Sequence, residues 1–61
     1  MTGEELKAIR LSMKLSQDEF AKRLGSAQAN ISKMERGKLP ISHILAIAIF
    51  GVQQGLDKKV A

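Results

Sequence analysis

Start and stop signals within residues 16–37 constrain the fold of this chain more than any other feature of its sequence. Ser16 followed by Glu19 is typical of a capping box. In this motif the hydroxyl accepts a hydrogen bond from an N–H of the first helical turn, and the carboxylate accepts one from the N-cap N–H. Gly25 predicts the end of that helix, because the residue just past a helix often takes a left-handed backbone that glycine adopts without steric hindrance. The pattern therefore predicts one short helix between Ser16 and Gly25.

A second short helix has to follow within two or three residues of that glycine. It is expected to begin at Ser26 or Ala27, and Gly37 predicts its end. Two helices joined by so short a glycine-containing link form a helix-turn-helix unit. In DNA-binding proteins the second helix of this unit lies in the major groove.

The two sides of the second helix follow from a turn of about 100° per residue. Ile31 and Met34 fall on one side with Ala27 between them, so this side must be buried. The opposite side carries an amide, a methyl group, a hydroxyl and two cations, and it has no large apolar side chain. Its residues are Ala29, Ser32, Lys33 and Arg36, with Gln28 and Glu35 on the flanks. A solvated face without a ligand would have the same pattern, so that alternative stays open.

The unit resembles the helix-turn-helix of the phage repressor and Cro family, also called the Xre type. The matching residues are Leu15, Ser16, Gln17, Phe20, Ala21, Leu24, Gly25, Gln28, Ile31, Ser32, Glu35, Arg36 and Gly37. A looser match extends from about Leu6 to Val52. The resemblance implies an all-α fold, a compact four- or five-helix bundle of the lambda-repressor-like type, with residues 1–61 as a single DNA-binding domain.

The chain departs from the family pattern at Ala27, where the family has a serine or threonine as helix cap. Ser26 is expected to take over this cap one residue earlier. The resemblance also implies that Arg10 pairs with Glu35 and so ties the first helix to the recognition helix. The alternative is an exposed arginine that contributes little to stability.

The resemblance implies two sets of DNA contacts. Base contacts are expected from Gln28, Ala29, Lys33 and Ser32, and phosphate contacts from Gln17, Arg36, Lys38, His43 and Asn30. Side-chain chemistry favours Gln28 for adenine, the Ala29 methyl group for the thymine methyl group, and Lys33 for guanine.

The charge distribution agrees with a polyanionic partner. Ten Lys and Arg against six Asp and Glu give a net charge of +4 and a pI near 9.9. Residues 21–40 contain five basic residues and a single acid, Glu35. A basic patch of this kind is typical of domains that bind nucleic acid.

Two further helices flank the unit. Thr2 and Glu5 form another capping box, which predicts a helix from about Gly3 to Met13. After the only proline, Pro40, a helix is expected from Ile41 or Ser42 to Phe50.

The segment from Ile44 to Phe50 has no polar face at all, and a helix that is apolar all round has to be covered all round. Either residues 52–60 or a second copy of the chain must cover it, and the polar tail favours the second copy. The expected dimer-interface residues are Ile47, Ile49, Phe50 and Val52. The resemblance implies a weak last helix here, from about Gln53 to Lys58.

Several classes of protein find no support in this sequence. His43 is the only histidine and cysteine is absent, so no metal site, cofactor or catalytic group is expected. No signal segment or membrane span is expected either. The chain is predicted to bind double-stranded DNA in the cytoplasm of a bacterial or phage-infected cell, as a regulator of transcription. It is most simply a Cro-like repressor that binds a palindromic operator as a homodimer, without a membrane partner or a small-molecule substrate. The alternative is an antitoxin or adaptor that grips a partner protein through residues 44–50.

Overall fold

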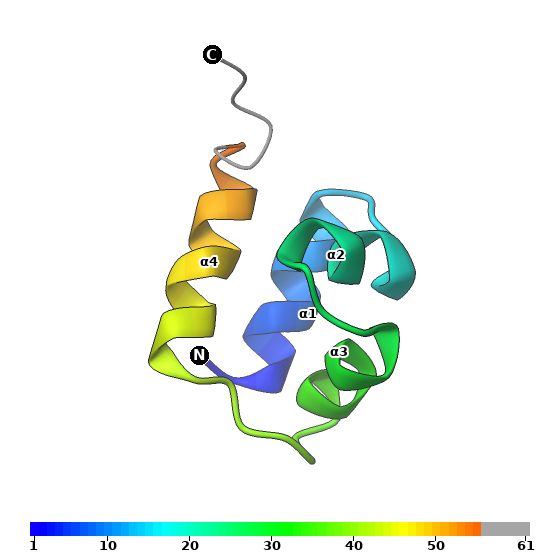
Figure 1. Ribbon diagram of the computed structural model, residues 1–61, viewed down its shortest axis with the longest axis vertical. Coiled ribbons are helices and arrows are strands. Elements are labelled where there is room, and N and C mark those ends of the chain that lie inside the picture. The colour runs from blue at the N-terminus through cyan, green and yellow to red at the C-terminus, as the bar shows by residue number, and fades with distance from the viewer. Residues whose placement is uncertain (56–61) are drawn as a thin grey trace.

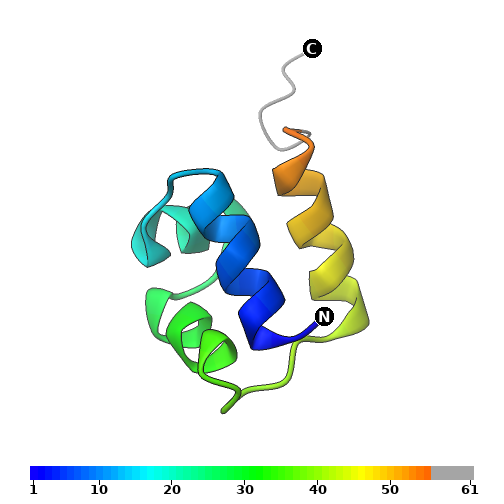
Figure 2. The same cartoon turned by 180° about the vertical axis from the view of Figure 1, so that it is seen from behind.

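The computed structural model describes residues 1–55, which form four α-helices and no strand. The helices are α1 (Gly3–Ser12), α2 (Gln17–Leu24), α3 (Gln28–Glu35) and α4 (His43–Gln53), as Figure 1 shows. The all-α fold predicted from the sequence is therefore confirmed. Seen from both sides, α4 stands at the opposite edge of the domain from α3 (Figure 2).

The capping boxes at the starts of α1 and α2 are both present. The Thr2 hydroxyl accepts a hydrogen bond from the Glu5 N–H at 3.1 Å, and the Glu5 carboxylate accepts one from the Thr2 N–H at 2.8 Å. Ser16 and Glu19 repeat this geometry at 3.1 and 2.9 Å. The backbone N–H groups that these carboxylates accept from lower the pKa of Glu5 and Glu19 below the ordinary value.

The turn between α2 and α3 is built on Gly25, whose φ of 70° is in the left-handed region. The Ser26 N–H donates to the carbonyl of Ala21 at 2.9 Å, so Ser26 belongs to the turn that closes α2. The N-cap of α3 is Ala27, without a side-chain hydrogen bond. The prediction that Ser26 caps this helix is therefore wrong. Gly37, with a φ of 76°, follows the end of α3 as predicted.

The hydrophobic core gathers buried side chains from all four helices. They are Leu6, Phe20, Ala21, Ile31, Met34, Ile49 and Val52. Ile49 and Val52 were expected at a dimer interface, and the structure instead places both in the core of the domain itself. The reason is their spacing on α4, since Leu45, Ile49 and Val52 share the side that packs onto the other helices.

The start of α1 lies against the end of α3. A Cβ atom at Gly3 would overlap the backbone carbonyl oxygens of Met34 and Glu35, so only glycine fits this close approach. Gly3 thus lets the first turn of α1 lie directly against the last turn of α3.

Helix α4 begins later and ends later than the sequence predicts. Its N-cap is Ser42, whose hydroxyl accepts from the Leu45 N–H at 3.1 Å, and it continues through Gln53. The weak helix expected from Gln53 to Lys58 therefore starts inside α4, and residues 56–58 lie outside the described residues. Among residues 1–55, no helix is long and apolar enough to cross a membrane.

Candidate nucleic-acid interface

Helix α3 has a buried side and an outward side, as its sequence predicts. Ile31 and Met34 are buried against the core. Gln28, Ala29 and Lys33 are exposed as expected, and so are Asn30 and the C-cap residue Arg36. Glu35, expected on a flank of the outward side, is instead nearly buried, because it pairs with Arg10. Ser32, also expected to contact a base, is half-buried between the two sides. The outward side therefore offers amide, methyl and ammonium groups along one short helix.

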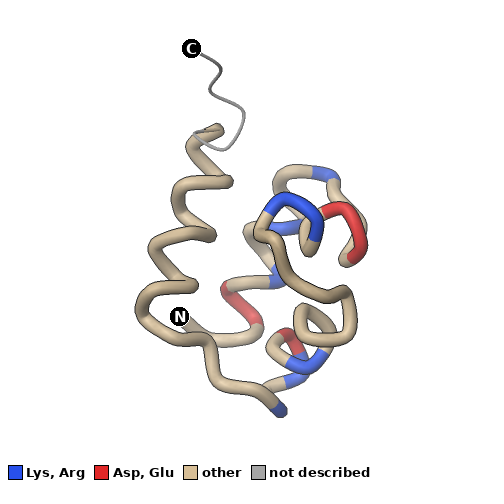
Figure 3. The backbone as a smooth tube through the Cα atoms, in the orientation of Figure 1, with Lys and Arg blue, Asp and Glu red and all other residues tan. Residues whose placement is uncertain are grey.

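Charge is distributed unevenly over the domain. Figure 3 places lysine and arginine on α1, α2, α3 and the loop after α3, whereas α4 carries no charged residue. Lys33, Arg36 and Lys38 are all exposed at the second half of α3 and just after it. The Arg36 Nε donates to the carbonyl of Ser32 at 3.3 Å, which holds the guanidinium close to the last turn of the helix. The positive groups thus lie at one end of the outward side of α3.

Arg10 of α1 and Glu35 of α3 form a nearly buried ion pair. The Arg10 Nε donates to Glu35 Oε2 at 2.6 Å and its Nη2 donates to Oε1 at 3.2 Å. Their side chains are 10% and 4% exposed. A third bond runs from Arg10 Nη1 to the carbonyl of Leu15 at 2.8 Å. The pair implied by the resemblance is therefore confirmed, and it fixes the last turn of α3 to α1 and to the residue that precedes the α2 cap.

Glu35 is held in its charged form by these partners. Burial disfavours the carboxylate, but hydrogen bonds from Arg10 and Gln17, together with the charge of Arg10, outweigh this effect and lower the pKa of Glu35. A charged, hydrogen-bonded carboxylate is a rigid acceptor, so it can orient the donors around it.

Two glutamines extend this network to the start of α3. Gln17 Nε2 donates to Glu35 Oε1 at 3.1 Å, and Gln28 Nε2 donates to Gln17 Oε1 at 2.7 Å. Gln28 uses one of its two amide hydrogens in this bond, so its second hydrogen and its Oε1 stay available. An amide donor beside an amide acceptor is the pair that matches the major-groove edge of adenine.

Sequence reasoning identified these residues separately and missed the links between them. Gln17 and Glu35 are 18 residues apart, and Gln17 and Gln28 are 11 apart. Their contact depends on how α2 and α3 cross, and no local pattern reports this. A side-chain hydrogen bond joins Gln17 and Gln28, and with them the starts of α2 and α3.

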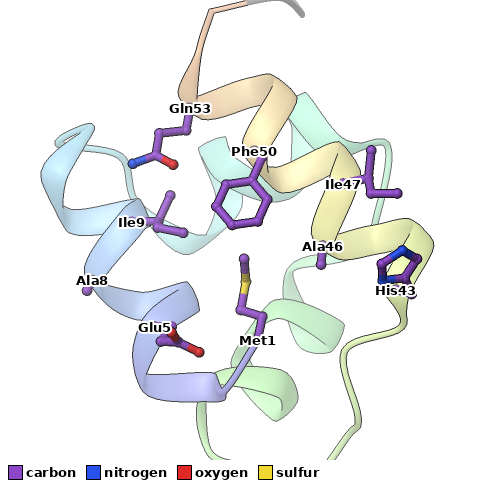
Figure 4. A pocket seen from close by; sticks show the side chains of 9 residues that line it. All are labelled: Met1, Glu5, Ala8, Ile9, His43, Ala46, Ile47, Phe50 and Gln53. Atoms are coloured by element: carbon purple, nitrogen blue, oxygen red, sulfur yellow. The ribbon is translucent and has the colours of Figure 1, made fainter.

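His43 stands apart from this set. It is the first residue of α4 and lines a groove of about 550 Å³ between α1 and α4. Figure 4 shows Phe50 and Ile9 pointing toward each other across this groove, with Met1 and Glu5 near one end and Gln53 near the other. Among the described residues, no three His, Asp or Glu side chains lie close enough to hold a metal ion.

Comparison with known protein families agrees with this geometry. A family model described as helix-turn-helix, of the Xre and lambda-repressor-like type, matches residues 6–50, which is most of the chain. Neither a curated protein nor a solved structure matches the chain. The matched residues contain α2, α3 and the turn between them, together with Arg10 and Glu35.

Proposed function

The chain belongs to the Xre-type helix-turn-helix family, a family of DNA-binding regulators, and from this premise we propose that it is a Cro-like transcriptional repressor. In this proposal it binds a palindromic operator as a homodimer. The observation that carries the proposal is the outward side of α3, which exposes amide, methyl and ammonium groups. The Arg10–Glu35 pair fixes this helix to α1.

The proposed mechanism places α3 in the major groove. Gln28 would read adenine with its free amide hydrogen and Oε1, the Ala29 methyl group would contact a thymine methyl group, and Lys33 would read guanine. Ser32 is half-buried, so it would contact a base less closely than Gln28, Ala29 and Lys33.

Phosphate contacts would hold the domain in register on the duplex. Arg36 and Lys38 supply positive charge at the end of α3, and Gln17 and Asn30 supply amides near its start. His43, at the start of α4, would contact DNA phosphates only outside the part of the duplex that α3 covers. Contacts of this kind position the protein and carry no sequence information by themselves.

The Gln28–Gln17–Glu35 hydrogen-bond network also supports sequence-specific binding, because it fixes the side chain of Gln28 before DNA binds. A glutamine on an exposed helix has several rotamers, and fixing one of them before binding reduces the entropy lost on DNA. The buried Glu35 orients Gln17, and Gln17 in turn orients Gln28. We therefore propose that the base-reading amide is preorganised by a carboxylate that does not touch DNA.

A second candidate function is supported by α4. Ile44, Ile47 and Phe50 are 80%, 59% and 51% exposed, which suits an antitoxin or adaptor that grips another protein. This surface fits either function, whereas the basic outward side of α3 has no use in the adaptor function. The charge distribution therefore favours DNA binding.

Selection of bound duplexes from a random pool tests the proposal. We expect enrichment of a palindromic consensus whose two halves are about one helical turn apart. The matched control is the double variant Gln28→Ala, Lys33→Ala, which keeps the phosphate-contacting residues and should lose most of the enrichment. Failure of the unmodified protein to enrich any sequence would contradict the proposal and favour the adaptor function.

A further inference from the structure

Lys14, in the connection between α1 and α2, has an unusual backbone conformation. Its φ of 58° is in the left-handed region, and no other residue of the described chain except glycine has a positive φ. In this region the Cβ atom of an L-residue lies too close to a carbonyl oxygen, whereas glycine enters it freely. The backbone alone therefore favours glycine at this position, and conformations of this kind are concentrated at functional sites.

The fold makes no use of the Lys14 side chain. It is exposed, and within residues 1–55 its ammonium group takes part in neither a hydrogen bond nor an ion pair. Backbone bonds hold the turn instead. The Lys14 N–H donates to the Leu11 carbonyl at 3.0 Å, and the Leu15 N–H donates to the Arg10 carbonyl at 3.3 Å. These bonds are independent of the side chain at position 14, so a use for the lysine has to lie outside the domain.

The turn at Lys14 lies beside the recognition helix. The carbonyl of Leu15, the next residue, accepts from Arg10 Nη1 at 2.8 Å, and the same guanidinium pairs with Glu35 of α3. Gln17 is three residues beyond Lys14 and also donates to Glu35, at 3.1 Å. Three residues span at most about 11 Å of extended chain. Lys14 therefore lies on the flank of α3 where α2 begins, close to the expected phosphate contact Gln17.

This flank of α3 is short of positive charge. The expected phosphate contacts at the starts of α2 and α3 are neutral amides, and the basic cluster described above lies at the end of α3. The first turn of α2 carries two acids, Asp18 and Glu19, which repel a duplex. Lys14 is the only basic residue in residues 11–21. Its ammonium group is thus the one cation that this part of the chain can offer to a phosphate.

We infer that Lys14 is a further phosphate contact of this protein, on the α2 flank of the recognition helix. In this arrangement its ammonium group binds the phosphate that Gln17 contacts or one next to it. Lysine binds phosphate as a point charge, so its side chain needs no partner in the free protein. With Arg36 and Lys38 beyond the end of α3, the duplex is held from a second side, which fixes α3 in register. The inference rests on the proposed function, since the phosphate belongs to the bound duplex.

Two variants separate the charge of Lys14 from its backbone. Lys14→Gly removes the charge and suits the left-handed backbone, so it should raise the melting temperature. It should also weaken binding to every duplex by about fivefold and reduce the slope of log affinity against log salt by about one unit. Lys14→Gln removes the charge alone and should change the slope equally. A lower melting temperature for Lys14→Gly would show that the lysine serves the fold, and it would overturn the inference.

Two controls accompany these variants. Lys14→Arg keeps the charge and should keep the slope of the unmodified protein. Lys22→Gln removes an exposed charge from α2, away from the expected contacts, and should leave the slope nearly unchanged. A slope that falls as much in Lys22→Gln as in Lys14→Gln would mean that net charge alone is responsible, and it would overturn the inference.

Neutral phosphates locate the contact. In the selected operator, one phosphate at a time is replaced by an uncharged methylphosphonate. At one position in each half-site, the replacement should weaken binding of the unmodified protein by about fivefold and have no effect on Lys14→Gln. That position should be the one whose effect Gln17→Ala removes, or its neighbour. If no position behaves in this way, Lys14 does not contact a phosphate.

These outcomes are distinct from a failure of the proposed function. If the unmodified protein binds no duplex, the proposed function fails and the inference fails with it. If the unmodified protein binds duplex DNA with a salt-dependent affinity, and both Lys14→Gly and Lys14→Gln keep its slope, the proposed function stands and only the contact at Lys14 is wrong.

Discussion

Arg10 and Glu35 join α1 to the end of α3 through two side-chain hydrogen bonds of 2.6 and 3.2 Å in a nearly solvent-free setting. A buried ion pair adds little net stability over an apolar pair, but the loss of one partner leaves a buried charge unpaired. The Arg10 guanidinium thus helps to fix α3 relative to α1, beside the core packing of Ile31 and Met34.

We expect Arg10→Met to lower the free energy of unfolding by about 3–5 kcal/mol, because the Glu35 carboxylate stays buried without its main donor. Thermal unfolding followed by circular dichroism measures this. The control is Lys22→Ala, which breaks the exposed pair with Asp18 at 3.3 Å and should change stability by less than about 0.5 kcal/mol. Similar losses for the two variants would mean that burial of the Arg10–Glu35 pair has no energetic consequence.

Acid should weaken the domain through the same carboxylate. The pKa of Glu35 is lowered in the folded state from an ordinary value of 4.5. Its contribution to stability is therefore fully present above pH 4.5 and is lost as the pH falls through the lower, folded-state pKa. We expect the melting temperature to decrease below about pH 4.5, and Glu35→Gln to flatten part of that decrease. The capping carboxylates Glu5 and Glu19, whose pKa values are also lowered, account for a remaining part. Identical pH profiles for the variant and the unmodified protein would contradict this assignment.

Local chemistry explains which parts of the fold were predictable. The Ser16–Glu19 capping box and the helix stop at Gly25 each need only residues close in sequence, and both are confirmed. The end of α1 is different, because the chain turns there at Lys14 with a left-handed φ of 58°, and lysine gives no signal for this conformation. The Arg10–Glu35 pair was accessible only through resemblance to a family, since 25 residues separate the partners.

The assignment of the sides of α4 failed for a related reason. In α3, polar residues mark which side faces outward, whereas the run from Ile44 to Phe50 has no polar residue to mark either side. Ile49 and Ile47 are chemically identical, yet one is fully buried and the other is 59% exposed. Only the packing of α4 on the other helices distinguishes them.

The close approach at Gly3 provides a stability prediction that involves no charge. Gly3→Ala should lower the free energy of unfolding by about 1–3 kcal/mol, because its methyl group overlaps two carbonyl oxygens of α3 that cannot move independently. Gly51→Ala is the matched control, since its methyl group meets nothing and removes a flexible residue from a helix interior. It should stabilise the fold by about 0.5–1 kcal/mol. Chemical denaturation at low protein concentration compares the two, and equal signs would contradict the close approach.

The phosphate contacts can be distinguished by their salt dependence. Arg36→Ala or Lys38→Ala should weaken binding to every duplex alike and reduce the slope of log affinity against log salt by about one unit for each lost contact. Lys22→Ala removes the same charge from α2, away from the expected contacts, and should leave the slope nearly unchanged. Titrations of fluorescent duplex at several salt concentrations give these slopes. An unchanged slope for both Arg36→Ala and Lys38→Ala would rule out the proposed docking edge.

The base contacts should show the opposite behaviour. Lys33 is exposed on the outward side of α3, one residue after the half-buried Ser32. Lys33→Ala should cost about 1–3 kcal/mol on the selected operator and little on random DNA, and it should relax the consensus at one base pair in each half-site. Gln28→Ala should behave in the same way at a different base pair. It should leave the melting temperature almost unchanged, because Gln28 is an exposed end of the hydrogen-bond network. Parallel titrations of the selected duplex and a scrambled duplex at one salt concentration provide the comparison. If Lys33→Ala weakened both duplexes equally, Lys33 would be a phosphate contact and α3 would be rotated about its axis from the orientation proposed here.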